Sequence, residues 1–449
     1  MTRIKERANV KSVLSVIIVV LVIFLLGAFS SLFERGGRSW VPVAMDKIKV
    51  VLGLNKPKVV KGGLSISTAR YEFETVVQST HPGTYQITTV DAKNVIAIER
   101  NTGLLLSLTP EGKSYKETVL SESVFPKDLK DSIKGRKLDN STPPLVMDLH
   151  FGMNKLLYSV VIQEKEKACQ YLALYEVSLG SPVNKELAEP ILHFQTPCVK
   201  DTQNTAMWAG RIANNDSQIF LSVGEQRYDR SGYPKSNLFS KEDLVIGNTV
   251  FGKILTFNPF SFEHSVYSMG HRNAQGLFWD KEKYELLSAE HGPNGGDEVN
   301  VIYQGGNYGW PFASFGKPYP TLYPSGLPEV NGSKNPSTGV DLIPARKGYL
   351  SGTHEGYAFP LMSWSPGVGI GNVLRVASDS PLKDWRGDIL AATMGERHLH
   401  RLRLHNGAVV FDENIDVGVR IRDILLLSNG NVAVSLDTAP VFILKVSDI

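Results

Sequence analysis

The chain of 449 residues is long enough for two or three ordinary domains or for one large all-β domain. Its hydrophobic content of 42%, with 40 glycines and 24 prolines, indicates a globular, turn-rich protein and excludes disordered and collagen-like classes. The formal net charge of +3 is carried by residues 1–11, so the rest of the chain has no basic excess, which argues against a nucleic-acid partner.

The first predicted element is the uncharged run SVLSVIIVVLVIFLLGAFSSLF, residues 12–33, which follows the basic tip. As a helix at roughly 1.5 Å per residue it would span about 33 Å, enough for a bilayer core. A cleavable signal peptide is the alternative, because residues 28–30 have a small-x-small pattern, but its apolar core normally covers about 7–15 residues. The sequence therefore predicts a single-pass signal anchor with a cytoplasmic N-terminus, a linker over residues 34–62, and the remainder on the exported (periplasmic or extracellular) side.

Export changes the interpretation of the two cysteines, Cys169 and Cys198. Neither lies in a CxxC or Cys/His metal-binding spacing. In an oxidising compartment a disulfide between them is expected, and two buried free thiols are the alternative.

Short β-rich runs recur over residues 63–449, each closed by a turn signal. Examples are NVIAIERNTGLLLSLTPEG, GRIANNDSQIFLSVGEQ and RDILLLSNGNVAVSLD. Apart from a short polar stretch near residues 127–134, no amphipathic helix of three turns is visible. Hairpins repeating without βα alternation predict an all-β fold, a six-bladed β-propeller, with a pair of β-sandwiches as the alternative.

The usual catalytic motifs GxxxxGK[ST], HExxH and GxSxG are absent. His398 and His400 lie two apart on a predicted strand and therefore on one face. They could bind a metal ion, but no third ligand is visible, so a solvated outer strand is the preferred interpretation.

Two pairs of polar residues lie where predicted strands begin. Arg272 and Asn273 precede an apolar strand that starts near Gly276, and Arg420 and Arg422 alternate onto one face of a later strand. Guanidinium groups pair with carboxylates and amides both donate and accept, so two such sites converging on one channel would suit a small polyanionic ligand. Solvated arginines in ordinary loops are the alternative.

The turn EHGPNGGDEVN, residues 290–300, has a different chemistry. Gly292, Gly295 and Gly296 permit unusual backbone angles, and such a turn can aim carbonyl oxygens at a hard cation such as Ca²⁺. Asp297 or Glu298 would supply negative charge nearby.

The stretch GHRNAQGLFWD…SAEHGPNGGDEVNVIYQGGNYGWP, residues 270–311, resembles the signature region of the glucose/sorbosone dehydrogenase family. These are the soluble-type sugar dehydrogenases that depend on pyrroloquinoline quinone (PQQ). Residues 209–226 and 420–437 fit weaker motifs of the family. The resemblance implies a six-bladed propeller that binds PQQ through Ca²⁺ at the mouth of its channel.

The resemblance also implies roles for individual residues. PQQ would be contacted by Arg272, Asn273, Arg420 and Arg422. The Ca²⁺ ion would be held by the carbonyls of Gly292 and Pro293, with Glu298 at a position linked to further Ca²⁺ binding. Trp364 would form part of the substrate wall.

Two positions depart from the family pattern. Met207, in MWAGR, occupies the position of the family's general-base histidine, and a thioether cannot accept the proton of a sugar hydroxyl. Gly395 occupies the position of a PQQ-binding lysine, although Arg397 is close in sequence. If another base serves, Glu225 is the first candidate.

Three functions follow from these observations. The first is a PQQ-dependent sugar dehydrogenase that passes electrons to an external acceptor. The second is a catalytically inactive propeller that keeps the pocket and binds a carbohydrate or a protein. The third is a purely structural exported propeller, against which the arginines argue.

Overall fold

A computed structural model gives the structure of the chain, with two compact units, residues 1–56 and 57–449. It describes residues 60–61, 70–75, 83–91, 94–111, 114–135, 143–178, 188–200, 207–226, 249–317, 329–330, 333–334, 341–343, 346–347, 350–437 and 439–447. The predicted basic tip, signal anchor and most of the linker lie outside these residues. β1 (Val60–Lys61), at the end of the predicted linker, is a strand.

The predicted single-pass membrane location needs correction, because no helix among the described residues is long and apolar enough to cross a membrane. The described helices are α3 (Lys127–Ile133) and η2 (Lys383–Trp385), of seven and three residues. At roughly 1.5 Å per residue the longer one extends about 10 Å, against roughly 30 Å for a bilayer core. Residues 12–33, which carried the prediction, lie outside the described residues.

The described part of residues 57–449 is an all-β propeller, as predicted. The alternative prediction, a pair of β-sandwiches, is wrong. Five antiparallel sheets each use one stretch of chain. Their strands are β3 (Tyr85–Thr89), β4 (Val95–Glu99), β5 (Leu105–Glu111), β6 (Ser114–Ser121); β7 (Leu145–Gly152), β8 (Lys155–Glu164), β9 (Cys169–Val177), β10 (Ile191–Gln195), β11 (Val199–Lys200); β12 (Ala209–Asn214), β13 (Ile219–Val223), β14 (Lys253–Phe257), β15 (His264–Met269); β16 (Ala274–Asp280), β17 (Glu285–Glu290), β18 (Asp297–Ile302), β25 (Met362–Trp364); and β26 (Ile370–Arg375), β27 (Ile389–Thr393), β28 (His398–His405), β29 (Ala408–Asp416).

A further sheet joins the two ends of the propeller. It contains β30 (Ile421–Leu426), β31 (Val432–Leu436), β32 (Ala439–Ser447), β2 (Arg70–Thr75) and β1, in the order β1-β2-β32-β31-β30. β2 runs antiparallel to β32, with Arg70 opposite Ser447. An early strand therefore completes a sheet whose other long strands come last in the chain.

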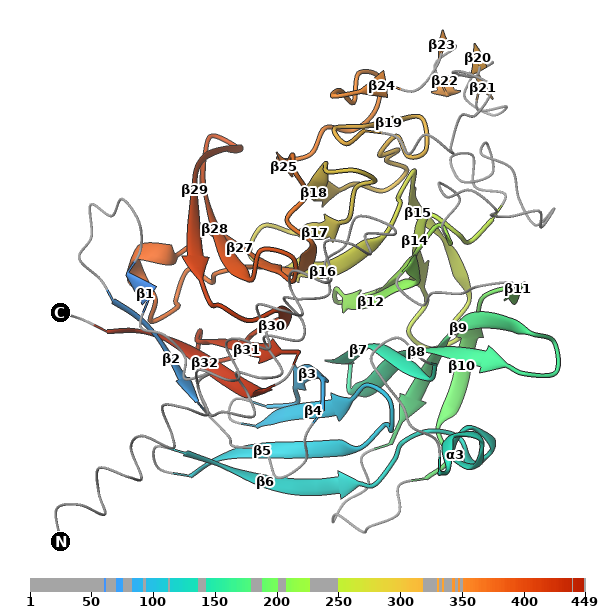
Figure 1. Ribbon diagram of the computed structural model, residues 1–449, viewed down its shortest axis with the longest axis vertical. Helices are drawn as coiled ribbons and strands as arrows, with labels where there is room; N and C mark the ends of the chain where they lie inside the picture. Colours follow the sequence, from blue (N-terminus) through green and yellow to red (C-terminus); the bar gives the residue numbers. More distant parts are fainter. Residues whose placement is uncertain are drawn as a thin grey trace, which may run out of the picture. The chain divides into compact units, whose positions relative to one another are not determined.

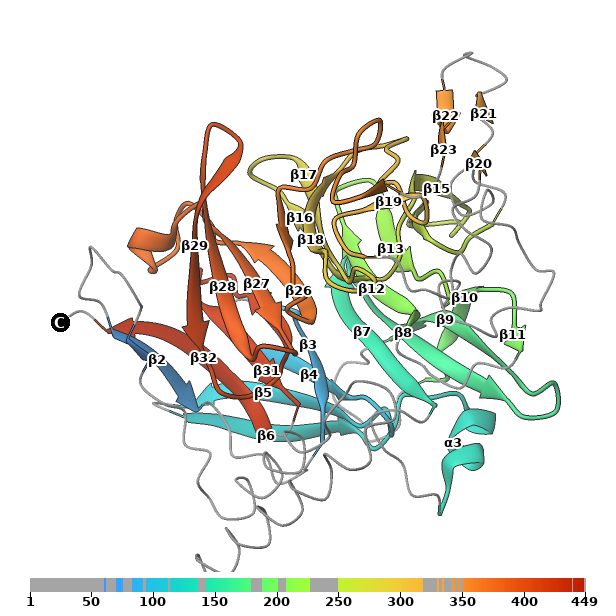
Figure 2. The ribbon, with the colours of Figure 1, turned by 45° about the horizontal axis from the view of Figure 1, so that its top comes forward.

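The innermost strands β3, β7, β12, β16, β26 and β30 contact one another in a closed circuit around a central channel. Figure 1 and Figure 2 show the sheets arranged around this centre. Short pairs lie outside the circuit: β19 (Ala313–Ser314) with β24 (Leu350–Ser351), β20 (Glu329–Val330) with β23 (Arg346–Lys347), and β21 (Ser333–Lys334) with β22 (Asp341–Ile343).

Local sequence accounts for the hairpins, and burial accounts for their stacking. The turn between β28 and β29 contains Asn406 and Gly407 with φ of 51° and 79°, the left-handed pair that a tight hairpin requires. Between neighbouring sheets the apolar faces pack together, as where Leu157, Trp208 and Leu221 share one buried cluster. Burying each such side chain contributes about 1.5–3 kcal/mol.

A buried arginine occupies the channel between the inner strands. Arg211, on β12, is 4% exposed, and its Nη1 donates to Gln86 Oε1 (3.0 Å), Asp148 Oδ1 (2.8 Å) and Asp423 Oδ1 (3.1 Å). These acceptors lie on β3, β7 and β30. Burial raises the pKa of Asp148 to about 7 although the charge of Arg211 lowers it, and the like charge of Asp423 adds to the increase.

The same network reaches the other inner strands. Arg211 Nε donates to the main-chain oxygen of Gln275 on β16 (2.8 Å), and its Nη2 donates to that of Arg422 on β30 (3.1 Å). Asn372 on β26 donates to Asp423 Oδ1 (2.8 Å). One connected network therefore ties together the six inner strands.

Cys169 and Cys198 form a disulfide, with Cα atoms 5.5 Å apart. Cys169 begins β9, and Cys198 directly precedes β11, which pairs with that strand. The bond therefore fixes a short edge strand to its own sheet.

Replacing Arg211 by Met should destabilise the fold by about 3–5 kcal/mol in urea unfolding, because two buried carboxylates lose their counter-ion. Arg403→Met is the matched control, since Arg403 also pairs with a carboxylate, Asp388, but its side chain is 47% exposed. The control should cost less than about 1 kcal/mol. Equal losses in the two variants would contradict the role given to Arg211.

The double substitution Cys169→Ser/Cys198→Ser should lower the free energy of unfolding by about 3 kcal/mol, because it frees a loop of 29 residues in the unfolded chain. Dithiothreitol should produce the same loss in the wild-type protein and no further loss in the variant. A reductant effect that persists in the variant would show that the loss has another origin.

Candidate functional site

The predicted site residues gather at the channel mouth where the inner strands begin. Arg272 and Asn273 directly precede β16, Met207 lies two residues before β12, and Arg420 directly precedes β30. The turns between second and third strands of a sheet lie at this same end, which places residues 291–296 there as well. We call this end the entry mouth.

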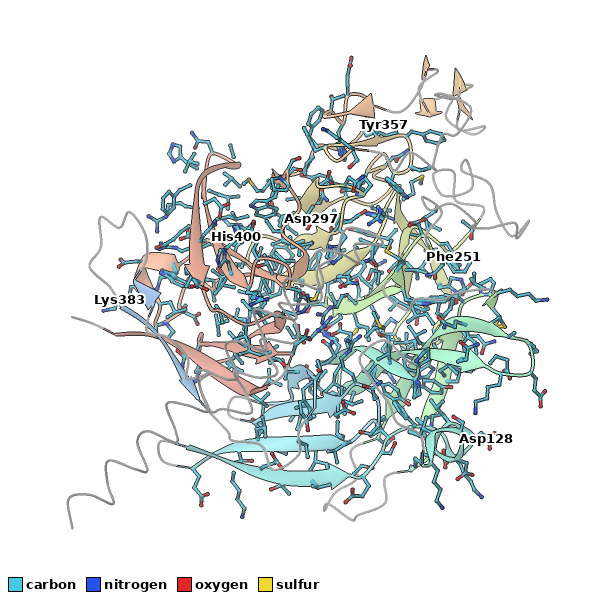
Figure 3. All side chains as sticks on the ribbon, in the orientation of Figure 1. Asp128, Phe251, Asp297, Tyr357, Lys383 and His400 are labelled. Atoms are coloured by element: carbon cyan, nitrogen blue, oxygen red, sulfur yellow. A yellow bond between two sulfur atoms is a disulfide. The ribbon has the colours of Figure 1, made fainter. Side chains whose placement is uncertain are left out.

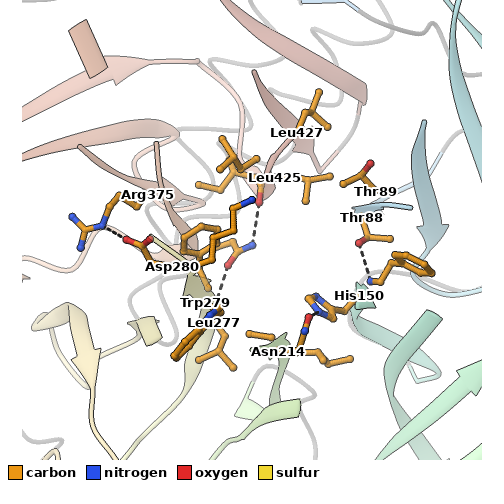
Figure 4. Close-up of a pocket in the computed structure, with 18 of the residues that line it drawn as sticks. Thr88, Thr89, His150, Asn214, Leu277, Trp279, Asp280, Arg375, Leu425 and Leu427 are labelled. Atoms are coloured by element: carbon orange, nitrogen blue, oxygen red, sulfur yellow. Dashed lines mark hydrogen bonds and ion pairs between the residues drawn. The ribbon is translucent and has the colours of Figure 1, made fainter. Parts of the chain in front are cut away.

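A cavity of about 440 Å³ lies at the opposite mouth, where the inner strands end. Figure 4 shows its polar and aromatic lining, which includes Thr88, His150, Asn214 and Trp279. His150 Nε2 and Asn214 Oδ1 are 2.7 Å apart across two sheets. None of the residues predicted to bind cofactor or metal lines this cavity.

Arg272 and Asn273 are both buried at the entry mouth. Arg272 Nη1 donates to the main-chain oxygen of His291 (3.1 Å), and its guanidinium lies 5.4 Å from the ring centre of Trp310. Asn273 Oδ1 accepts from the main-chain N–H of Ala209 (3.1 Å), so this oxygen joins two sheets.

The Gly-rich turn is held by Asp297. Its Oδ1 accepts from Gly292 N (3.0 Å), and its Oδ2 accepts from Gly369 N (2.7 Å) on the neighbouring sheet. Burial opposes ionisation, but the nearby His291, together with the main-chain donors, lowers the pKa of Asp297. Asp297 thus fixes the turn. A Cβ on Gly292 would lie 2.2 Å from Gly295 O, so the turn requires glycine here.

Beside this turn lies a cavity of about 10 Å³, enough for about one water molecule or one ion. Its lining includes Arg272, Gly292, Pro293, Glu290 and Glu298. The structure therefore brings together the predicted metal residues and one predicted cofactor residue. The two buried carboxylates, Glu290 and Glu298, are oxygen donors of the kind that fits a hard cation such as Ca²⁺.

Glu298 interacts with His354, a residue that was not predicted from the sequence. His354 Nε2 lies 2.9 Å from Glu298 Oε1, and its Nδ1 lies 3.1 Å from Ala358 O. Burial raises the pKa of Glu298, although His354 counteracts it. Burial alone would lower the pKa of His354, but the hydrogen bond and charge of Glu298 raise it.

Arg420 and Arg422 share one carboxylate at the entry mouth. Asp437 accepts from Arg420 Nε (2.7 Å) and from Arg422 Nη2 (2.6 Å). Burial opposes ionisation of Asp437, but Arg422 and Arg420 lower its pKa. Arg100, not predicted, lies nearby: burial and then the charge of Arg422 lower its pKa to about 9. The cluster is therefore a region of positive potential that fits an anionic group.

Of the remaining predicted residues, Trp364 and Met207 are buried, and Gly395 lies close to the backbone of a neighbouring segment. Trp364 is 8% exposed, and its Nε1 donates to Asp412 Oδ2 (3.0 Å). Met207 is 7% exposed. Gly395 cannot carry a side chain without movement, because a Cβ there would lie 2.5 Å from Val368 O.

Glu225 is fully buried, and its main-chain N–H donates to Arg272 O (2.9 Å). His291, at the same mouth, keeps 19% of its side chain exposed, with Nδ1 3.7 Å from Asp297 Oδ2. Both are titratable groups close to the predicted cofactor residues.

The sequence analysis missed Arg100, Glu290 and His354. Arg100 and His354 lie outside the quoted motifs, and the three residues reach the mouth from different segments. Glu290 could have been identified from the sequence, because it is the first residue of the turn EHGPNGGDEVN.

A family model described as Glucose / Sorbosone dehydrogenase matches residues 86–445. An uncharacterized protein of Synechocystis is 32% identical over 239 residues, which cover 49% of this chain and 51% of that protein. An aldose sugar dehydrogenase of Escherichia coli is 27% identical over 248 residues, covering 54% and 60%. Quinoprotein glucose dehydrogenase B of Acinetobacter calcoaceticus is 29% identical over 239 residues, covering 47% of each. The chain thus matches about half the length of these relatives.

Solved structures resemble the fold over a longer range. The soluble aldose sugar dehydrogenase of Escherichia coli, in its apo form, has a TM-score of 0.60 at 18% identity, covering 84% of this chain and 99% of that one. The PQQ-bound aldose sugar dehydrogenase of Streptomyces coelicolor has a TM-score of 0.56 at 17% identity, covering 87% and 100%. At such identities the likeness concerns the fold.

Asp437→Asn should destabilise the protein by about 3 kcal/mol at pH 7, because Arg420 and Arg422 lose their shared carboxylate. The folded pKa of Asp437 is lowered, so its contribution is present above the unfolded value near 4 and is lost as the pH falls through the folded value. The difference between variant and wild type in urea unfolding should therefore shrink below about pH 4. The exposed Asp416→Asn is the control and should differ little from wild type at any pH; a constant Asp437 effect would contradict this account.

Proposed function

The chain belongs to the glucose/sorbosone dehydrogenase family, and from this premise we propose that it binds PQQ and Ca²⁺ at the entry mouth and acts as an oxidoreductase on sugar CH–OH groups. The observation that carries the proposal is the arginine cluster. Arg272, Arg420 and Arg422, three of the residues predicted to contact PQQ, lie at this mouth together with Arg100.

The charges at the mouth suit a cofactor with several carboxylates. Asp437 is the shared carboxylate between Arg420 and Arg422, and Arg100 adds a further cation whose charged form is disfavoured by burial and by Arg422. An anion bound here would relieve that repulsion. Arg420, with 36% of its side chain exposed, can turn from Asp437 toward a ligand.

The Ca²⁺ ion would occupy the small cavity beside Gly292 and Pro293, with Glu298 supplying charge. The volume of about 10 Å³ and the two carboxylates in the lining, Glu290 and Glu298, support this assignment. The main-chain bonds that Asp297 accepts hold the turn in shape before any ion binds.

PQQ, when bound, would supply the redox chemistry and accept the hydride equivalent from the sugar carbon. The chain must then remove the hydroxyl proton, and Met207 cannot do so. Glu225 is the first candidate base and His291 the second, because both lie within the loops that hold Arg272. An external electron acceptor would complete the cycle.

We also infer six blades. The five sheets built from single stretches and the sheet closed by β2 and β32 support this number, as does the closed circuit of inner strands.

The alternative function is a catalytically inactive propeller that binds a carbohydrate or a protein at the same mouth. Two observations favour it. Met207 replaces an imidazole, and the close approach of Gly395 to Val368 leaves no room for the lysine that the resemblance expects. Binding of PQQ would then be weaker than in relatives, since one cation is missing.

The test loads the full chain with PQQ and Ca²⁺ and measures dye reduction over a panel of aldoses. We expect PQQ with Ca²⁺ to raise the melting temperature and aldose oxidation to be low, because general-base assistance typically accounts for about 10²–10⁴-fold in rate. Met207→His should raise the rate by about 10²-fold. Met269→His, on β15 in the same sheet but at its outer edge, is the matched control and should leave the rate unchanged.

The outcomes separate the two functions. Bound PQQ without any rate increase in Met207→His would support the inactive propeller. High wild-type turnover that is lost in Glu225→Gln would assign the base to Glu225. A melting temperature unaffected by PQQ and Ca²⁺ together would contradict the proposed PQQ-dependent function.

A further inference from the structure

Three side chains with metal-binding atoms converge at the turn between β27 and β28. They are Glu396, His398 and His400, and their ligand atoms all lie within 4.8 Å of one another. Glu396 Oε2 is 3.4 Å from His398 Nδ1 and 3.4 Å from His400 Nε2. The two histidines therefore have a third ligand, which reaches them from the turn that precedes their strand. Figure 3 marks His400 on the ribbon.

The inner histidine is already oriented for a metal ion. His400 has 1% of its side chain exposed, and its Nδ1 lies 2.8 Å from Asp412 Oδ1. A carboxylate can only accept, so Nδ1 donates to Asp412, and Nε2 is the ring nitrogen that faces Glu396. A carboxylate behind a ligand histidine is the usual second shell of a zinc site.

The nitrogen atoms that face the cluster lack other partners. Within the described part of the chain, His400 Nε2 and His398 Nδ1 are both buried atoms without a hydrogen-bond partner. Buried polar atoms are normally satisfied, and a metal ion bound between these two nitrogens and the carboxylate of Glu396 would satisfy both.

The turn that carries Glu396 is fixed in place. Thr393 Oγ1 donates to His398 O (2.8 Å) and accepts from His398 N (2.9 Å), which closes the turn. Main-chain bonds from Met394 to Gly369 O (2.7 Å) and from Glu396 to Val368 O (3.0 Å) attach it to the start of the β26 sheet. A site held by such bonds loses little entropy when a metal ion binds.

We infer that Glu396, His398 and His400 form a binding site for a divalent transition metal ion of the zinc type. Zinc bonds to nitrogen are about 2.0–2.1 Å long, so ligand atoms at the corners of a tetrahedron lie about 3.3 Å apart, close to the two distances of 3.4 Å. Two imidazoles and one carboxylate disfavour Ca²⁺ and Mg²⁺, which take oxygen ligands. The ion is therefore distinct from the Ca²⁺ proposed at the Gly-rich turn.

Three protein ligands leave the fourth tetrahedral position for water or a substrate oxygen. Glu396 and His398 keep 36% and 29% of their side chains exposed, so the ion can enter from solvent. Asp412 connects the site to Trp364, because it accepts both from the indole N–H (3.0 Å) and from His400. An ion on His400 would therefore fix the ring of Trp364 through this shared carboxylate.

The experiment titrates the full chain, stripped by a chelator, with Zn²⁺ in millimolar Ca²⁺ and follows the heat of binding. We expect one equivalent of Zn²⁺ with micromolar or tighter affinity. Glu396→Gln and His398→Gln, whose side chains are partly exposed, should abolish detectable binding without unfolding the protein. Asp412→Asn should weaken binding by about 10–100-fold, the usual effect of a lost second-shell carboxylate.

His405→Gln is the matched control, because His405 lies exposed on the same strand, and it should bind like wild type. Co²⁺ gives a second readout, since a four-coordinate site produces intense visible absorption that should vanish in His398→Gln. Absence of Zn²⁺ binding, unchanged binding in Glu396→Gln and His398→Gln, or an equal loss in His405→Gln would overturn the inference.

Discussion

The propeller depends on the buried charge network around Arg211. Apolar packing between sheets is non-directional and would tolerate small shifts of one sheet against the next. A guanidinium with donors in a fixed plane does not tolerate such shifts, because each N–H must meet its own acceptor. Gln86, Asp148, Gln275 and Asp423 supply acceptors on four different inner strands. The network therefore sets the register of the inner strands and separates the two mouths of the channel.

The entry mouth uses acidic side chains to hold its basic ones. Asp437 fixes Arg420 and Arg422, while Glu290 accepts from the main-chain N–H of Arg272 and from His271. These contacts give the arginines defined positions before any ligand arrives, which lowers the entropy lost on binding. The cost is that a ligand must compete with the resident carboxylate for the same donors.

Sequence reasoning succeeded where the signal is local. Turn residues and alternating apolar strands predicted the propeller, and the position of Arg272 before a strand predicted its place at a mouth. It failed where segments far apart in sequence meet, as for Arg100 and His354. Glu396 was missed although it is two residues from His398, because the φ of 67° at Arg397 folds the turn back, and strand alternation does not predict such a turn. The membrane prediction rested on residues 12–33 alone, without support from the described helices.

The pairing of β2 with β32 has a consequence for how the protein is made. Arg70 and Ser447 are partners in one ladder, so that sheet cannot form until the ribosome has translated nearly all of the propeller. Until then the edge of β2 that pairs with β32 stays open. Such edges invite pairing with other nascent chains, and contacts of this sequence separation slow folding. The ring therefore closes late in synthesis. Until it closes, the growing chain is prone to aggregation, so the yield of folded protein depends on chaperones.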